Sequence, residues 1–161
     1  PFAGSGCPSA GVRMFAPAEA VRDSEKEAAA PALDSALTHW PIQIRLIPPT
    51  APFLKNADLL VLADCGAVAA ADLHTRLLPG KVVMMGCPKF DNAQSYIEKF
   101  ARICKESGIK SITTVIMEVP CCAGLPAIVK KGMQAAGQNI PVKEVVVSTR
   151  GDVLRPVSEA V

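Results

Sequence analysis

Three short apolar runs constrain the fold of this 161-residue chain more than any other feature. They begin at Leu59, Val82 and Ile112, and a stretch with helical spacing follows each of them. Unbroken runs of Val, Leu, Ile and Met are typical of strands that are covered on both faces of a parallel sheet. Strands that alternate with helices form right-handed βαβ units. The sequence therefore predicts an α/β fold, a single three-layer domain with a mostly parallel, Rossmann-like sheet of about five strands.

The bounds of the expected elements follow from hydrophobic spacing and from the Gly and Pro residues that interrupt it. An additional strand is expected before the first run, because Ile42, Ile44 and Leu46 alternate with polar residues. The predicted strands cover residues 42–47, 59–64, 81–86, 111–119 and 142–147. The predicted helices cover residues 67–78, 91–107 and 125–136, with a short helical crossover at 51–57.

Cysteines stand at the ends of the three apolar runs. Cys65 follows the first run, Cys87 the second, and the adjacent pair Cys121 and Cys122 the third. The carboxyl ends of parallel strands lie along one edge of a sheet, and open α/β sheets bind their ligands in the crevice outside that edge. These four thiols are therefore expected to converge, and four thiolates suit a soft metal or an iron–sulfur cluster. Cys7, in a Gly/Ser/Pro-rich loop, is a fifth candidate ligand.

Six cysteines also permit a disulfide framework. That alternative is weaker here, because a chain with this much apolar sequence and regular strand–helix alternation needs no covalent staples. The paired CxxC motifs of zinc ribbons and the closely spaced cysteines of bacterial ferredoxins are missing from the sequence. A cluster would thus be assembled by the fold. The sixth cysteine, Cys104, shares an apolar helical stripe with Phe100 and Ile103, which predicts a core position.

Charge and motifs exclude several classes of function. The formal net charge is +2, with basic and acidic residues interspersed along the chain, so nucleic acid is not an expected partner. No apolar run approaches the roughly 20 residues that span a bilayer, and no secretory signal precedes the fold. The glycine signatures of dinucleotide-binding and P-loop proteins are absent, so no nucleotide is expected. Clustered reduced thiols fit a cytoplasmic protein.

Several motifs together resemble a known family. They include Trp40-Pro41, Gly86-Cys87-Pro88-Lys89, and the run from Met117 to the pair Cys121-Cys122. Over about residues 4–147 the sequence resembles the C-terminal domain of a family of anaerobic ferredoxin-type 4Fe-4S iron–sulfur proteins. This resemblance implies iron–sulfur cluster binding and a neighbouring ferredoxin domain. The ferredoxin motifs themselves are missing from this chain.

Three functions follow from the thiols and the resemblance. The first is an electron-transfer protein or subunit with a [4Fe-4S] cluster bound by Cys65, Cys87 and the pair Cys121 and Cys122, with Cys7 able to complete the set. Its partner would be a ferredoxin or another redox protein. The second is a cluster- or thiol-dependent redox enzyme, and the third is a structural zinc-binding interaction domain. The sequence does not decide the oligomeric state.

The expected organisation has three parts. Residues 1–38 form a Gly/Pro/Ala-rich linker or arm that carries Cys7, in which 16–37 are expected to be mobile or to order on a partner. Residues 39–149 form the α/β iron–sulfur-binding domain, and 150–161 form a polar tail. His74 and His39 are interpreted as a helix-surface and an element-boundary residue. Lys89, Asp91 and Glu118 are interpreted as solvated loop or helix-cap groups beside the cysteines.

Overall fold

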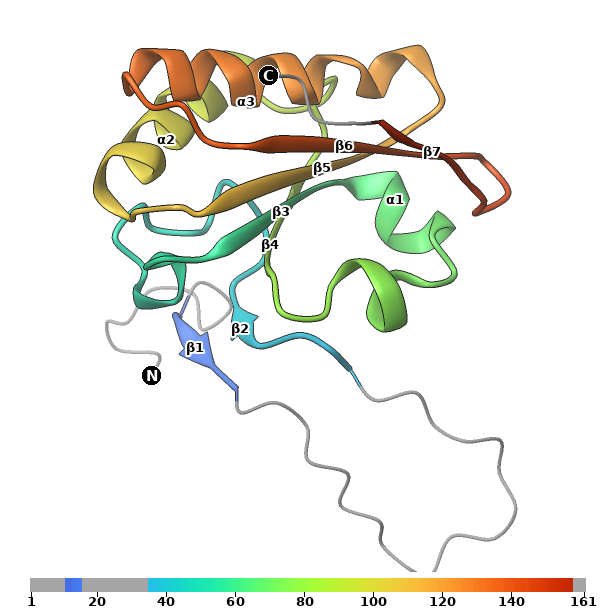
Figure 1. The fold of residues 1–161 in the computed structure, drawn as a ribbon, viewed down its shortest axis with the longest axis horizontal. Coiled ribbons are helices and arrows are strands. Elements are labelled where there is room, and N and C mark those ends of the chain that lie inside the picture. Colours follow the sequence, from blue (N-terminus) through green and yellow to red (C-terminus); the bar gives the residue numbers. More distant parts are fainter. Residues whose placement is uncertain (1–10, 16–34, 158–161) are drawn as a thin grey trace, which may run out of the picture.

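The structure, a computed structural model, describes residues 11–15 and 35–157. Its centre is a five-stranded sheet in the order β4-β3-β5-β6-β7 (Figure 1). The first four strands are parallel, and β7 pairs with β6 in the antiparallel direction. The predicted α/β fold with a mostly parallel sheet is confirmed. The strands are β3 (Asp58–Ala63), β4 (Val82–Gly86), β5 (Ser111–Met117), β6 (Val142–Val147) and β7 (Val153–Val157).

Helices cover the sheet in two layers. Helices α2 (Ala93–Glu106) and α3 (Gly124–Ala135) pack against each other (Figure 1). Helix α1 (Asp64–Ala69) and the π-helix η3 (Leu73–Leu77) connect β3 to β4. The connection from β3 to β4 steps across the sheet in the opposite direction to the connection from β4 to β5. Crossovers between parallel strands are right-handed as a rule, which places α1 on the face opposite α2 and α3.

Helix α2 begins and packs as its sequence predicts. The Asn92 side chain accepts a hydrogen bond from the backbone N–H of Ser95 at 3.0 Å, which caps the first turn. The apolar stripe of the helix is buried and includes Phe100 and Cys104. Cys104 is 3% exposed, which confirms its predicted core position. In α3, Gly132 faces this stripe and lets the two helices approach closely.

The free edge of β4 is covered by the chain that precedes η2 (Pro52–Leu54). The backbone N–H of Ile44 donates to the carbonyl of Met85 at 2.9 Å, and the N–H of Met85 donates to Ile42 at 2.8 Å. A ring nitrogen of His39, Nε2, donates to the carbonyl of Val83 at 2.9 Å. His39 lies in the short strand β2 (His39–Trp40), which pairs with β1 (Arg13–Met14).

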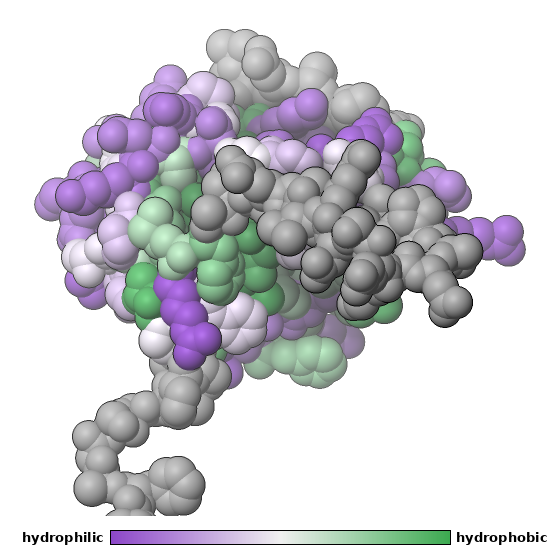
Figure 2. Space-filling model, turned by 90° about the horizontal axis from the view of Figure 1, so that it is seen from below, coloured by the Kyte–Doolittle hydropathy of each residue, from purple (hydrophilic) through white to green (hydrophobic). Residues whose placement is uncertain are grey.

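This lower part of the molecule also carries apolar side chains at its surface. Val12, Met14, Phe15 and Leu46 are each more than two-fifths exposed. In the view from below, green hydrophobic residues gather on the face, with purple hydrophilic residues around them (Figure 2). No helix among the described residues is long and apolar enough to cross a bilayer.

The predicted strand at 42–47 is wrong. Within it only Gln43 forms a bridge, to Met85, and the following residues turn. The ammonium of Lys99, from α2, accounts for the turn. It donates to the carbonyls of Ile44, Arg45 and Ile47 at 2.7, 2.8 and 3.0 Å. Successive carbonyls of an extended strand point in opposite directions, so three of them cannot reach one ammonium unless the chain bends.

The fifth strand lies where a polar tail was predicted. Strand β7 falls within residues 150–161, and Gly151 forms part of the turn that leads to it with a φ of 95°. Such a φ suits glycine, and an added Cβ would also collide with the carbonyl oxygen of Ala69. The sequence after β6 is short and largely polar, so its pattern did not indicate this edge strand.

The remaining differences concern helix lengths and the arm. The predicted helix at 67–78 is divided between α1 and η3, and the crossover at 51–57 shortens to the three-residue 3₁₀ helix η2. Residues 13 and 14 of the predicted arm pair with β2. Cys7 and residues 16–34 lie outside the described residues.

A first prediction concerns the contact between α2 and α3. A Cβ added at Gly132 would lie 2.5 Å from Cβ of Phe100 and 3.1 Å from the carbonyl oxygen of Ile97. Gly132→Ala should therefore lower the free energy of unfolding by about 1–2 kcal/mol, although alanine favours helix, because overpacking outweighs propensity. Urea unfolding measures this change. The control Gln134→Ala, at an exposed position of the same helix, should change stability by less than about 0.5 kcal/mol.

A second prediction concerns His39, whose side chain is fully buried and has no partner for Nδ1. Its ring is tilted by 40° against that of Phe53, with the ring centroids 4.4 Å apart. Burial lowers the pKa of His39, and the hydrogen bond to Val83 opposes this only in part. The native protein then binds fewer protons than the unfolded chain, so stability should fall as the pH drops below about 6.5.

Urea unfolding between pH 5 and 7.5 tests this, and His39→Gln, which keeps an N–H donor but does not titrate there, should flatten the dependence. A dependence that survives in His39→Gln would contradict the assignment.

Candidate thiol site at the topological switch point

The sheet order creates one switch point in the parallel part of the sheet. The chain leaves β3 toward α1 on one face, and it leaves β5 toward α3 on the other face. Strands β3 and β5 are neighbours, paired from Asp58 with Ser111 to Leu62 with Val115. Loops that part in this way open a crevice at the carboxyl ends of the two strands, where α/β proteins of this strand order bind ligands.

Three predicted cysteines lie at this switch point. Cys65 is the second residue of α1, directly after β3, and Cys121 and Cys122 lie in the 3₁₀ helix η4 (Pro120–Cys122), directly after β5. Cys65 and Cys121 are exposed, whereas Cys122 is buried and only 3% accessible. The structure thus brings together thiols that are more than 50 positions apart in the sequence.

The three thiols interact electrostatically. Burial raises the pKa of Cys122, and a hydrogen bond that its sulfur accepts from the Met117 backbone opposes the rise. Hydrogen bonding and charge repulsion with Cys121 raise it further, as does the charge of Cys65. Neighbouring thiolates repel one another, so a cation bound among them would stabilise their charged forms.

Cys87 approaches the same edge from β4. It is half-buried, and its backbone N–H donates to the carboxylate of Asp91 at 3.1 Å. The next residue, Pro88, lies against the start of α3, since an added Cβ on Gly124 would be 3.5 Å from Cβ of Pro88. The loop that carries Cys87 therefore borders the turn that follows Cys122.

The donor set fits a thiophilic group in its chemistry. Thiolates are the ligands that iron–sulfur clusters require and that zinc also accepts. Among the described residues, however, no three Cys, His, Asp or Glu side chains already lie in the arrangement of a metal site. Binding would therefore require side chains of this edge to rotate toward a common centre. The fifth candidate ligand, Cys7, is outside the described residues.

The roles of two acidic residues at the edge were not identified from the sequence. Asp91 was interpreted as a solvated loop or cap group, but Asn92 caps α2, and Asp91 accepts from Cys87 and from the hydroxyl of Tyr96. Burial works to raise the pKa of Asp91, yet these two hydrogen bonds and the Arg45 charge outweigh it and lower the pKa.

Asp64, between β3 and Cys65, is a second carboxyl at this edge. Burial raises its pKa, a hydrogen bond with Gln43 opposes the rise, and the charge of Asp91 adds to it. One carboxylate oxygen of Asp64 is buried without a hydrogen-bond partner. The sequence did contain a signal for both carboxyls, because Asp64 directly precedes Cys65 and Asp91 follows Cys87 by four residues.

The remaining sequence-predicted residues lie at the surface. Lys89 is exposed, and the exposed carboxylate of Glu118 accepts hydrogen bonds from the N–H and hydroxyl of Thr149 at 2.7 and 3.0 Å. His74 is exposed on η3, as expected for a helix-surface residue, and its Nδ1 accepts from the N–H of Ala36 at 3.2 Å.

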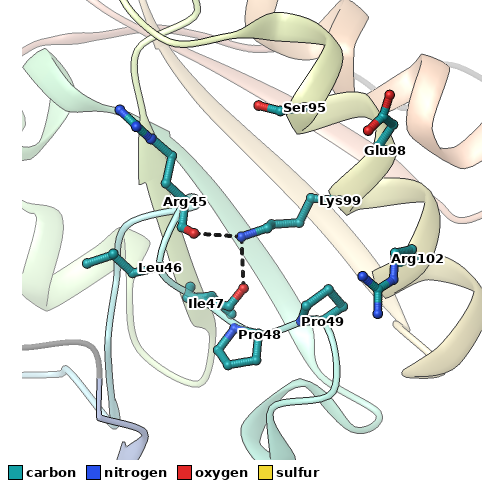
Figure 3. Close-up of a pocket in the computed structure, with 9 residues that line it drawn as sticks. All are labelled: Arg45, Leu46, Ile47, Pro48, Pro49, Ser95, Glu98, Lys99 and Arg102. Atoms are coloured by element: carbon teal, nitrogen blue, oxygen red, sulfur yellow. Dashed lines mark hydrogen bonds between the residues drawn. The ribbon is translucent and has the colours of Figure 1, made fainter. Parts of the chain in front are cut away.

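A separate cavity of about 380 Å³ lies between α2 and residues 45–49 (Figure 3). Basic side chains line it, but the Lys99 ammonium uses its three protons for the carbonyls of Ile44, Arg45 and Ile47. The Arg45 and Arg102 side chains point in different directions (Figure 3). This arrangement stabilises the loop and leaves the switch-point thiols as the candidate functional site.

Comparisons with known proteins agree with the fold. The sequence model of a family described as "Rossmann-like domain" matches residues 51–161. A protein of Archaeoglobus fulgidus, described as "Uncharacterized protein", is 32% identical over 114 residues, which cover 71% of this chain and 80% of that protein. No solved structure matches. The strand order, the switch point and the matched residues together show that the chain belongs to this family of Rossmann-like domains.

Proposed function

We propose that the switch-point edge binds an iron–sulfur cluster and that the protein transfers electrons, alone or as a subunit. The observation that carries the proposal is the position of Cys65 and the Cys121–Cys122 pair directly after β3 and β5, two neighbouring parallel strands. Iron–sulfur clusters are bound by several cysteine thiolates, and these strand ends supply such thiolates. The resemblance to ferredoxin-type iron–sulfur proteins supports the same function.

The proposed ligands differ in their surroundings. Cys65 and Cys121 are exposed, Cys87 is half-buried, and Cys122 is buried. Cys7 would complete the set if Cys122 faces the core. A [4Fe-4S] cluster would supply one-electron redox chemistry, and the protein would hold it, limit its contact with water and set its potential through nearby hydrogen bonds.

A redox partner would dock at this edge. Two large apolar side chains beside it are almost fully exposed, Val68 at 92% in α1 and Phe90 at 87% in the loop after Cys87. Exposed apolar residues that border a redox centre suit a small, transient contact. A ferredoxin or another redox protein is the partner that the family resemblance implies.

A thiol-dependent redox activity is the second candidate. It is favoured by the contact between the Cys121 and Cys122 thiols and by the nearby Cys65, which place one buried and two exposed thiols together. In this case an exposed thiolate would act as a nucleophile on a substrate. The third alternative, a structural zinc site, uses the same ligands but is redox-silent.

The iron–sulfur proposal is tested by anaerobic purification, iron and sulfide analysis, and EPR of the reduced protein. We expect iron and acid-labile sulfide in the wild-type protein and loss of most iron in Cys65→Ser and Cys87→Ser. Cys104→Ala should keep its iron and lose no more stability than about 1–2 kcal/mol, because it truncates a small core residue. Folded wild-type protein that binds no iron would overturn the proposal, and a redox-silent tetrahedral zinc would favour the structural alternative.

Alkylation of the metal-free protein tests the thiol-dependent alternative. At pH 8, iodoacetamide should modify exposed Cys65 and Cys121 far faster than Cys104, because burial raises the pKa of Cys104 to about 11. Peptide mass spectrometry resolves the individual rates. If Cys65 and Cys121 react no faster than Cys104, the edge holds no accessible nucleophile, and this alternative is excluded.

A further inference from the structure

The loop that carries Cys87 is held by polar atoms in an otherwise apolar setting. Tyr96 is 1% exposed, and its hydroxyl donates to Oδ2 of Asp91 at 2.5 Å. The same oxygen accepts from the backbone N–H of Cys87 at 3.1 Å. The N–H of Asp91 in turn donates to the carbonyl of Cys87 at 2.9 Å. Cys87 is therefore hydrogen-bonded through both its N–H and its carbonyl, to the side chain and the backbone of one residue.

The last residue of β4 is adapted to this arrangement. A Cβ added to Gly86 would collide with the hydroxyl oxygen of Tyr96 and would lie 3.0 Å from Cδ1 of Ile44. The Tyr96 hydroxyl thus occupies the space that any other residue at position 86 would fill. The absence of a side chain directly before Cys87 is what lets the hydroxyl reach Asp91.

An ordinary structural role does not account for these contacts. Asn92 already caps α2, so the helix does not need Asp91. A phenylalanine at position 96 would fill the core equally well. Burial disfavours the charged form of Asp91, and hydrogen bonds to Tyr96 and Cys87 offset that effect. The Tyr96 hydroxyl, the Asp91 carboxylate and the Cys87 N–H are instead linked to one another, and together they hold the turn from Cys87 to Asp91.

We propose that Gly86, Tyr96 and Asp91 form a clamp that positions the Cys87 thiol at the switch-point edge. The proposal rests on the function proposed above, for which Cys87 is one ligand. Tyr96 and Asp91 act as positioning residues, since their polar atoms contact the Cys87 backbone or one another. Arg45 supports the clamp from outside, 3.4 Å from the second Asp91 oxygen. Because Pro88 lies against the start of α3, the clamp also fixes the Cys87 loop relative to the loop of Cys122.

The clamp implies that Cys87 is held in place more firmly than the other thiols. No three thiols are already arranged as a metal site in the described residues, so closing around a ligand requires some of them to move. Cys65 and Cys121 are exposed at the surface, whereas the Cys87 backbone is held by hydrogen bonds to Asp91. Cys87 would then be the fixed point toward which the other thiols close, and losing the clamp should affect Cys87 before the others.

The test compares Tyr96→Phe with Ser111→Ala. Ser111 also donates a hydroxyl hydrogen bond of 2.5 Å to a carboxylate, that of Asp58, but at the amino end of the sheet. The two variants remove the same kind of interaction at opposite ends, so a general loss of stability should affect both. Urea unfolding is used to show that both variants fold and to compare their stabilities.

The first readout is alkylation of the metal-free proteins by iodoacetamide, resolved by peptide mass spectrometry. Tyr96→Phe should raise the rate at Cys87 by about tenfold, because the turn opens more often once a hydrogen bond to Asp91 is lost. The rates at Cys65 and Cys121 should stay within about twofold of wild type, and Ser111→Ala should leave all three unchanged. Asp91→Ala, which removes the acceptor itself, should raise the Cys87 rate at least as much.

Equal Cys87 alkylation rates in Tyr96→Phe and Ser111→Ala, or a uniform rise in rate at every thiol, would overturn the clamp.

The second readout is iron content after anaerobic reconstitution, which should fall in Tyr96→Phe and not in Ser111→Ala. If the wild-type protein binds no iron, the proposed function fails, while the alkylation rates still decide whether the clamp exists. If it binds iron and both variants retain it fully, Cys87 needs no positioning and the inference is wrong.

Discussion

The pairing of β3 with β5 is the interaction on which the rest of the structure depends. These parallel strands are central in the sheet, and their core residues, such as Leu60 and Val115, are fully buried. Parallel strands need helical crossovers, and the crossovers from β3 and β5 lie on opposite faces. The same pairing that forms the core therefore separates the two following loops. The position of Cys65, Cys121 and Cys122 at this edge is a geometric consequence of how the core is built.

The fold was predictable wherever one apolar pattern decided the structure. Unbroken runs before Cys65, Cys87 and Cys121 identified the three strands that deliver the candidate ligands, and the stripe of α2 placed Cys104 in the core. That these cysteines lie at one edge of the sheet followed from the parallel strands alone. How each thiol is oriented at that edge depends on side-chain contacts that sequence spacing does not record.

The errors arose where tertiary contacts override local pattern. Residues 42–47 alternate like a strand, but one ammonium, that of Lys99, collects three of their carbonyls and bends them. Strand β7 exists because β6 offers it an edge, and Gly151 allows the turn. Asp91 was missed as a clamp residue for the same reason, since its role depends on Tyr96, which is placed by the packing of α2. In each case the deciding partner is distant in sequence or lies on another element.

The thiols at this edge differ in their exposure to solvent. Cys122 is enclosed beside the core, and burial favours its neutral form, whereas Cys65 and Cys121 face solvent. A cation bound among them would be in contact with the protein interior on one side and accessible on the other. Electron transfer requires such a short path to a partner, and nucleophilic chemistry requires an accessible thiolate. The exposed Val68 and Phe90 lie in the segments that directly follow Cys65 and Cys87, so a protein partner that approaches these cysteines would meet apolar side chains. The geometry of the edge therefore favours exchange with something outside the protein over a purely structural site, which needs no open side.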